Sequence, residues 1–226
     1  MKKKILKALV ILGCAALLVV ASVMGTLAYL TSSSAVSNTF TVGDVSLNMT
    51  ETKVDSDGVP VTPAERTDTN TYRLVPNKTY TKDPTIYVSA NSTESFLFVK
   101  IRNQIAAIEK EGDTTIAKQM ENNGWLMLSS TATGDIWVYA KNDGGYTNGI
   151  IGGNVTEQVI PVFSSFTVKE NPENLTQYAA AKVTVTAFAI QTTGFIDKYD
   201  LDTARIHAWN KITEVFTFEN QPIALS

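Results

Sequence analysis

Few residues of this 226-residue chain could do acid-base, nucleophilic or metal chemistry. There is one histidine, His207, and one cysteine, Cys14. A zinc site of the usual kind needs several histidine or cysteine ligands, and a serine triad needs a histidine base. The chain has no His-Glu-x-x-His motif and no Gly-x-Ser-x-Gly motif. We therefore interpret His207 as a residue on one face of a C-terminal helix, and we predict no catalytic residue.

Two groups of aspartates are the candidates for metal binding. Carboxylate oxygens are the ligands that Ca²⁺ prefers, but neither group continues into the twelve-residue loop with a terminal glutamate that an EF-hand uses. We interpret the first group as a turn and the second as the start of a helix. A weak calcium site stays open at each group, and no cofactor is predicted. The two groups are Asp55 and Asp57, and Asp197, Asp200 and Asp202.

The N-terminus has the pattern of an export signal. Four lysines, the last of them Lys7, precede an uncharged apolar stretch over residues 8–30. A positive segment followed by an apolar one is typical of a secretory signal peptide. Thr26 and Ala28 are small residues at the −3 and −1 spacing that a signal peptidase accepts. We predict cleavage between Ala28 and Tyr29.

Two other interpretations of the N-terminus remain open. The apolar stretch is long enough to span a bilayer as an uncleaved anchor. Cys14 follows Ile-Leu-Gly, which is a loose match to a lipoprotein acylation site, but acylation there would leave the apolar residues 15–24 on the mature protein. Cleavage after Ala28 is favoured because the small-residue spacing agrees with the strand pattern that follows directly.

Charge and cysteine content limit the possible partners and the stabilising chemistry. Cleavage would remove four of the 19 basic residues and none of the 22 acidic ones, so the net charge would fall from −3 to −7. That balance argues against nucleic acid as a partner. Without Cys14 the exported chain has no disulfide, so it needs a real apolar core. We predict a secreted protein, in the extracellular matrix or at the cell surface.

Strand patterns dominate the rest of the chain. Apolar and polar residues alternate in 40–50, with a bulge or kink predicted at Gly43-Asp44, and again in 95–103. Residues 178–195 form a nearly charge-free strand, as expected in the middle of a packed sheet. One strand is predicted in 157–168 and a hairpin in 125–139. The predicted core residues are Phe40, Val42, Val45, Leu47, Leu97, Val99, Ile101, Val183 and Val185.

Helices are predicted in two places. Residues 104–123 change to a helical period with a break at Gly112, which indicates one or two short helices. Asp202 is the predicted N-cap of a final helix that runs to about Phe216. Eight or so short strands with turns between them predict a mainly β fold, a two-sheet β-sandwich with inserted short helices and a C-terminal helix.

The beginning of the chain resembles a known family. The segment GTLAYLTSSSAVSNTFTVGDVSLNM, residues 25–49, is similar to the N-terminal signature of the TasA/camelysin family: Gly-Thr-x-Ala, then Asn-Thr-Phe-Thr-x-Gly, then an alternating strand. A second block, residues 74–101, resembles the family's segment in which Lys-Asp-Pro, here residues 82–84, precedes a strand. The segment TAFAIQTTGF looks like a late strand of clostridial relatives. Residues 104–180 carry no such resemblance.

The resemblance implies a secreted protein of Gram-positive bacteria with a jelly-roll-like sandwich. It implies a signal peptide processed by a dedicated SipW-type signal peptidase, and assembly into biofilm-matrix fibres. Camelysin is classed as a cell-surface metallopeptidase, which makes a peptidase the enzymatic alternative. A monomeric surface adhesin or binding module is a third possibility. The expected domain organisation is a signal peptide over residues 1–28, an N-terminal arm over 29–39 and a sandwich domain over 40–226.

The arm is the candidate assembly element. Residues 29–39 carry no charge and are rich in Thr, Ser, Val and Tyr, so they can pair as a strand but bury too little surface to fold alone. The candidate assembly residues are Tyr29, Leu30, Val36 and Phe40. Cleavage would leave a free arm that adds a strand to a neighbouring copy. Such head-to-tail contacts need not close, so a filament results. The predicted partners are other copies of the chain, the signal peptidase and other matrix proteins.

Overall fold

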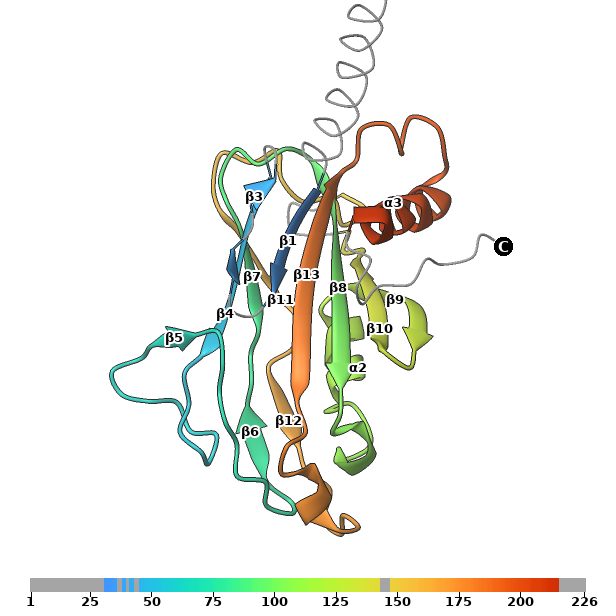
Figure 1. Ribbon diagram of the computed structural model, residues 1–226. Coiled ribbons are helices and arrows are strands. Elements are labelled where there is room, and N and C mark those ends of the chain that lie inside the picture. Colours follow the sequence, from blue (N-terminus) through green and yellow to red (C-terminus); the bar gives the residue numbers. More distant parts are fainter. Residues whose placement is uncertain (1–30, 36–37, 40, 43–44, 143–146, 216–226) are drawn as a thin grey trace, which may run out of the picture.

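The chain folds into a β-sandwich with one helix on its outer face (Figure 1). The computed structural model describes residues 31–35, 38–39, 41–42, 45–142 and 147–215, and for those before residue 45 it describes the strand pairing only. Among these residues, no helix combines the length and the hydropathy that a membrane crossing requires. The mainly β prediction is confirmed.

The larger sheet has six strands in the order β2-β1-β13-β8-β10-β9, and its paired strands are antiparallel. Its longest pairing joins β13 to β8 over nine residue pairs, from Val183 opposite Asn103 to Gln191 opposite Ser95. The strands are β1 (Thr31–Ala35), β2 (Asn38–Thr39), β8 (Ser95–Asn103), β9 (Trp125–Thr131), β10 (Gly134–Tyr139) and β13 (Val183–Gln191).

The second sheet has the order β11-β7-β4-β3, with β5 attached to β4, and a separate two-stranded ladder pairs β12 with β6. The chain passes back and forth between the two main sheets, which gives the jelly-roll-like form that was predicted. The strands are β3 (Thr41–Val42), β4 (Val45–Thr52), β5 (Arg66–Thr67), β6 (Thr79–Thr81), β7 (Thr85–Val88), β11 (Gln158–Pro161) and β12 (Ser165–Thr167).

Two strand predictions differ from the structure. Val42 lies opposite Val45, so β3 and β4 are the two arms of a hairpin and not one kinked strand. The single strand predicted in 157–168 is divided into β11 and β12. The chain turns between them because Val162 donates its N–H to the Pro84 carbonyl, while the Ser164 carbonyl accepts from the Lys82 N–H.

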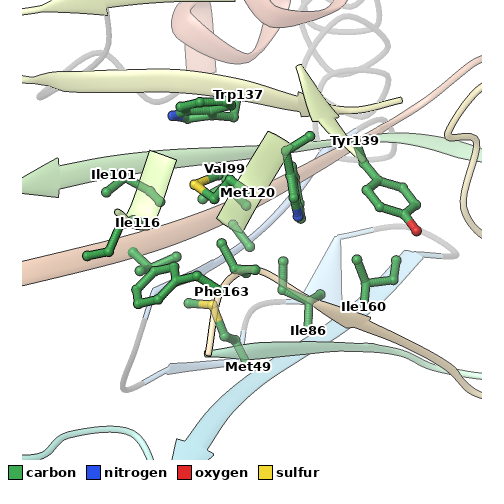
Figure 2. Close-up of a cluster of buried hydrophobic side chains, with 14 of the residues drawn as sticks. Met49, Ile86, Val99, Ile101, Ile116, Met120, Trp137, Tyr139, Ile160 and Phe163 are labelled. Atoms are coloured by element: carbon green, nitrogen blue, oxygen red, sulfur yellow. The ribbon is translucent and has the colours of Figure 1, made fainter. Parts of the chain in front are cut away.

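The main core lies between the two sheets (Figure 2). Met49 and Ile86 from the smaller sheet face Val99 and Trp137 from the larger one. Val183 is half-buried at its border. Phe40 and the side chain of Val42 lie outside the described residues. The predicted core residues that the structure confirms as buried are Val45, Leu47, Leu97, Val99, Ile101 and Val185.

Helix α3 (Leu201–Val215) builds a second core on the outer face of the six-stranded sheet. Its fully buried Trp209 contacts Phe98 of β8 and Phe188 of β13, with both ring centroids 5.6 Å away. Because β8 and β13 are covered on both faces, they are apolar on both faces. The prediction that residues near 183–191 form a central strand is confirmed.

The start of α3 corrects one prediction. Asp200, and not Asp202, is the N-cap, since its carboxylate accepts a hydrogen bond from the Thr203 N–H at 3.1 Å. Asp202 lies in the first turn and pairs with Arg205 at 3.1 Å. The cap is therefore two residues earlier than predicted, because Asp200 is the residue whose side chain reaches the unpaired N–H groups of the first turn.

The short helices between residues 104 and 123 are confirmed. They are η1 (Ala106–Ile108) and α2 (Ile116–Asn122), and Gly112 lies between them with a φ of +108°. Ile116 and Met120 of α2 enter the main core (Figure 2). One further single turn, η2 (Leu175–Tyr178), precedes β13.

Candidate functional site

The candidate assembly site is the edge of β13 that β1 covers. β13 pairs with β8 on one side and with β1 on the other (Figure 1). The β1 pairing runs over five residue pairs, from Thr31 opposite Ile190 to Ala35 opposite Thr186. Beyond β1 the sheet has only the two-residue strand β2 among the residues that the structure describes. The N-terminal strand therefore closes an edge of the larger sheet.

The strand that receives β1 is held rigidly from both faces. Ala187 and Ala189 belong to the core between the sheets, whereas Phe188 and Ile190 belong to the core under α3. All four are buried. An edge with such surroundings presents backbone N–H and C=O groups that need a strand partner. The β1 side of β13 is thus a preformed acceptor for one short strand.

Part of the predicted arm forms the strand β1. Residues 31–35 are paired with β13 of their own chain. The proposed cleavage residues Thr26, Ala28 and Tyr29, and the assembly residues Leu30, Val36 and Phe40, lie outside the described residues.

The first aspartate group forms a turn, as interpreted from the sequence. The Asp55 carboxylate accepts hydrogen bonds from the Asp57 and Val59 N–H groups, both at 2.9 Å. Asp57 pairs with Arg73 at 2.8 Å and with Lys78 at 3.0 Å. Hydrogen bonds from Arg73 and then Lys78 hold the pKa of Asp57 below its ordinary value. Both carboxylates are thus engaged by groups of the protein.

The second aspartate group also binds within the chain. Besides the roles of Asp200 and Asp202 at the start of α3, Asp197 accepts from the Gly194 N–H at 3.3 Å. His207 lies on α3, as predicted, and its ring stacks on Tyr199 with centroids 4.0 Å apart. Within the part of the chain that the structure describes, no three His, Cys, Asp or Glu residues are grouped as metal ligands.

A cavity at the end of β4 is lined by a buried charged pair, which the sequence analysis did not predict. Its volume is about 510 Å³. Lys82 pairs with Glu51 at 2.7 Å, and their side chains are only 9% and 2% exposed. The sequence did indicate that Glu51 is buried, because Glu51 follows Val45, Leu47 and Met49 at the inward positions of β4. A carboxylate in that register must be buried.

The Lys82-Asp83-Pro84 segment, singled out by the family resemblance, connects β6 to β7, and its side chains bind the end of β4. Lys82 points inward to Glu51, whereas Asp83 accepts hydrogen bonds from the Thr52 N–H at 2.6 Å and from the Thr52 hydroxyl at 2.7 Å. Arg66 also pairs with Asp83, at 2.9 Å. The segment therefore has a structural role in this chain.

Tyr72 adds a fixed hydroxyl beside the same cavity. It donates its O–H to the Thr81 carbonyl at 3.0 Å. Burial, and then the Glu51 carboxylate, raise the pKa of Tyr72 far above its ordinary value. The phenol is therefore a permanent hydrogen-bond donor at physiological pH.

Comparison with known proteins identified no relative of the chain. A scan of protein-family models, a search of curated proteins and a search of solved structures each found no match to the chain. The likeness to the TasA/camelysin family rests on the residues quoted above.

Proposed function

We propose that the chain is a secreted structural protein that assembles head-to-tail into extracellular fibres by exchanging its N-terminal strand. The observation that supports this is the place of β1: it is an N-terminal strand attached at a sheet edge by five residue pairs. In the assembled form, β1 of one copy occupies the β13 edge of the next. The resemblance to the TasA/camelysin family points to the same function.

Exchange conserves the contacts that the single chain already makes. A β1 strand from a neighbour forms the same backbone hydrogen bonds with β13 as the chain's own strand, which is the condition for domain swapping at low cost. Since β2 pairs with β1, the two strands are exchanged together, and the connection available as a hinge is short because β2 ends at Thr39 and β3 begins at Thr41. Short hinges favour exchange over refolding onto the same copy.

Export and processing complete the proposal. Cleavage between Ala28 and Tyr29 by a SipW-type signal peptidase leaves a new N-terminus two residues before β1. N-terminal sequencing of the exported protein should begin at Tyr29, and an exported form that retains Lys2 would contradict this step. The fibres form outside the cell, where other matrix proteins are further partners.

A reversible covalent lock tests the exchange directly. Ala35 and Thr186 lie opposite each other in the β1–β13 pairing, and directly paired strand positions are within the Cα separation that a disulfide accepts. The double variant Ala35→Cys/Thr186→Cys should form a disulfide within one chain, and the oxidised protein should remain monomeric by size exclusion and show no fibres by electron microscopy.

The reduced form of the same variant is the matched control. With the thiols reduced, β1 is released and fibres should appear at the rate of the unmodified chain. The opposite result is that the oxidised protein, with its disulfide within one chain, forms as many fibres as the reduced form. That result would overturn strand exchange as the assembly mechanism.

A further inference from the structure

The 510 Å³ cavity has the size and lining of a ligand site. It lies between the loop that precedes β6 and the η2 turn, with β13 along one side. Figure 1 shows the course of these segments. Cavities of roughly 300–1,000 Å³ with apolar walls and a few fixed polar groups are typical of small-molecule sites. Its wall therefore shows what kind of ligand would fit.

The buried ion pair provides the polar end of the cavity. Glu51 accepts from Lys82 through Oε2 at 2.7 Å and from the Asn70 amide through Oε1 at 3.0 Å. A carboxylate has about four acceptor positions and an ammonium group has three donors. Both residues line the cavity, and these bonds leave further acceptor positions on Glu51 and further donors on Lys82. A hydroxyl group, which donates and accepts at once, can use both without separating the two charges.

Aromatic and aliphatic side chains provide the apolar part of the lining. The rings of Tyr72 and Phe166 meet edge to face with centroids 5.3 Å apart. Tyr178, from the η2 turn, and Val183, at the start of β13, are half-buried and extend this apolar surface. Phe166 is buried and stacks on Tyr80, so the half-buried Tyr72 and Tyr178 are the rings that a ligand with a flat C–H face would cover.

The charges in the lining cancel. Two of the lining residues are acidic, Glu51 and Asp68, and two are basic, Lys82 and Lys182. Because neither sign of charge is in excess and Glu51 and Lys82 already pair with each other, the lining gives an added ion no net electrostatic attraction. The lining therefore favours a ligand with no net charge.

We propose that this cavity binds a neutral sugar, with one ring seated on the aromatic wall and its hydroxyl groups hydrogen-bonded to the Glu51–Lys82 pair. The hydroxyl groups match the donor and acceptor capacity of the pair, the ring matches the apolar wall, and the absence of charge matches the balanced lining. Sugar binding at this place does not depend on strand exchange, because β1 and the β13 edge that it covers contribute no residue to the cavity.

Saturation-transfer NMR on the purified full-length chain tests the proposal. The probes are glucose, galactose, N-acetylglucosamine and cellobiose, each at about 10 mM, which detects dissociation constants into the millimolar range. Glucuronate and glucosamine are the charged counterparts. At least one neutral sugar should show transfer, and its signal should exceed that of both charged sugars.

Two substitutions of exposed alanines place the binding in the cavity. Ala180→Trp puts a large side chain into the cavity lining, and we expect it to reduce sugar affinity more than tenfold. Ala132→Trp, in the turn between β9 and β10, is the matched control outside the cavity and should leave binding unchanged. Circular dichroism of both variants should show the fold of the unmodified chain. Any of three results would overturn the proposal. These are no transfer from any of the four neutral sugars, stronger transfer from a charged sugar, and undiminished binding by Ala180→Trp.

Discussion

At the scale of single residues, Gly58 is a position where the backbone requires glycine. Its φ is +76°, in the left-handed region, and a Cβ added there would lie 2.7 Å from Cδ1 of Tyr80. Tyr80 in turn holds the preceding loop, because its hydroxyl donates to the Arg73 carbonyl at 2.6 Å and accepts from the Val75 N–H at 2.7 Å. The turn and the loop are thus packed through one aromatic ring.

We expect Gly58→Ala to destabilise the fold more than Gly194→Ala does. Both substitutions impose the backbone cost of a left-handed alanine, about 1 kcal/mol. Only Gly58 adds a collision, since Gly194 has a φ of +87° and a Cβ added to it would meet no other atom within 4 Å. The difference in urea unfolding free energy should be about 1–3 kcal/mol. Equal losses in the two variants would show that Tyr80 moves aside without cost.

The Glu51–Lys82 pair leads to a second prediction at this scale. Lys82→Met leaves the Glu51 carboxylate buried and unpaired, so we expect a loss of about 3–5 kcal/mol in unfolding free energy. The exposed pair Lys53–Glu65, with side chains 50% and 49% exposed, is the control, and Lys53→Met should cost at most about 1 kcal/mol. Denaturant unfolding of both variants measures the contrast, and similar losses would mean that Glu51 finds another partner.

At the scale of elements, Glu109 connects the two short helices to the end of β8. Its carboxylate accepts from the Ile116 N–H, where α2 begins, at 3.2 Å and from the Asn103 amide at 3.0 Å. Burial raises the pKa of Glu109, and these two hydrogen bonds offset the rise only in part. Asp200 is the opposite case, because hydrogen bonds with Thr203 at the start of α3 lower its pKa.

The two carboxyl groups should therefore affect stability with opposite dependence on pH. For Glu109 the folded state binds the proton more tightly, so its contribution falls as pH rises from the unfolded pKa of 4.5 through the raised folded pKa. For Asp200 the contribution is present above the unfolded pKa of 3.8 and is lost as pH falls through the lowered folded pKa.

Urea unfolding across this acidic range measures both effects. Relative to Glu109→Gln, the unmodified chain should lose stability as pH rises. Relative to Asp200→Asn, which retains a capping side chain, it should gain stability as pH rises. Parallel pH profiles of the unmodified chain and Glu109→Gln would show that this carboxyl has the same pKa in both states.

At the scale of the whole molecule, the strand exchange proposed above would give each copy two unequal ends. One end donates β1, and the other accepts it at β13. A copy without the arm can still accept, because the acceptor strand is held by β8 and by the two cores. It cannot donate, so it can occupy only one end of a fibre.

We therefore predict that a chain lacking residues 29–38, with a working cleavage site, stops fibre growth. Alone it should remain folded by circular dichroism and monomeric by size exclusion. Mixed with the unmodified chain at a small molar fraction, it should shorten the fibres seen by electron microscopy. Fibres of unchanged length in the mixture, or fibres from the shortened chain alone, would contradict donation by this arm.

Much of this fold follows from local pattern. Alternation of apolar and polar residues predicts β4, because its two faces have different surroundings, and it also predicts β8, although α3 covers the second face of that strand. The same reasoning places Leu97, Val99 and Ile101 in the core. A change of period at residue 104 predicts η1 and α2, and the lack of charge in 183–191 predicts a strand covered on both faces. These features depend on neighbours in sequence or on burial alone.

Other features depend on which segments meet in space, which a single sequence does not state. Pairing of Thr31–Ala35 with β13 joins segments about 150 residues apart, and the division of residues 157–168 between two ladders depends on Pro84 and Lys82. Which aspartate caps α3 depends on the geometry of its first turn. The position of Glu51 in β4 predicts from the sequence that its side chain is buried. Only the tertiary structure shows that Lys82 lies beside it. A buried charge is tolerable only where the fold places an opposite charge next to it.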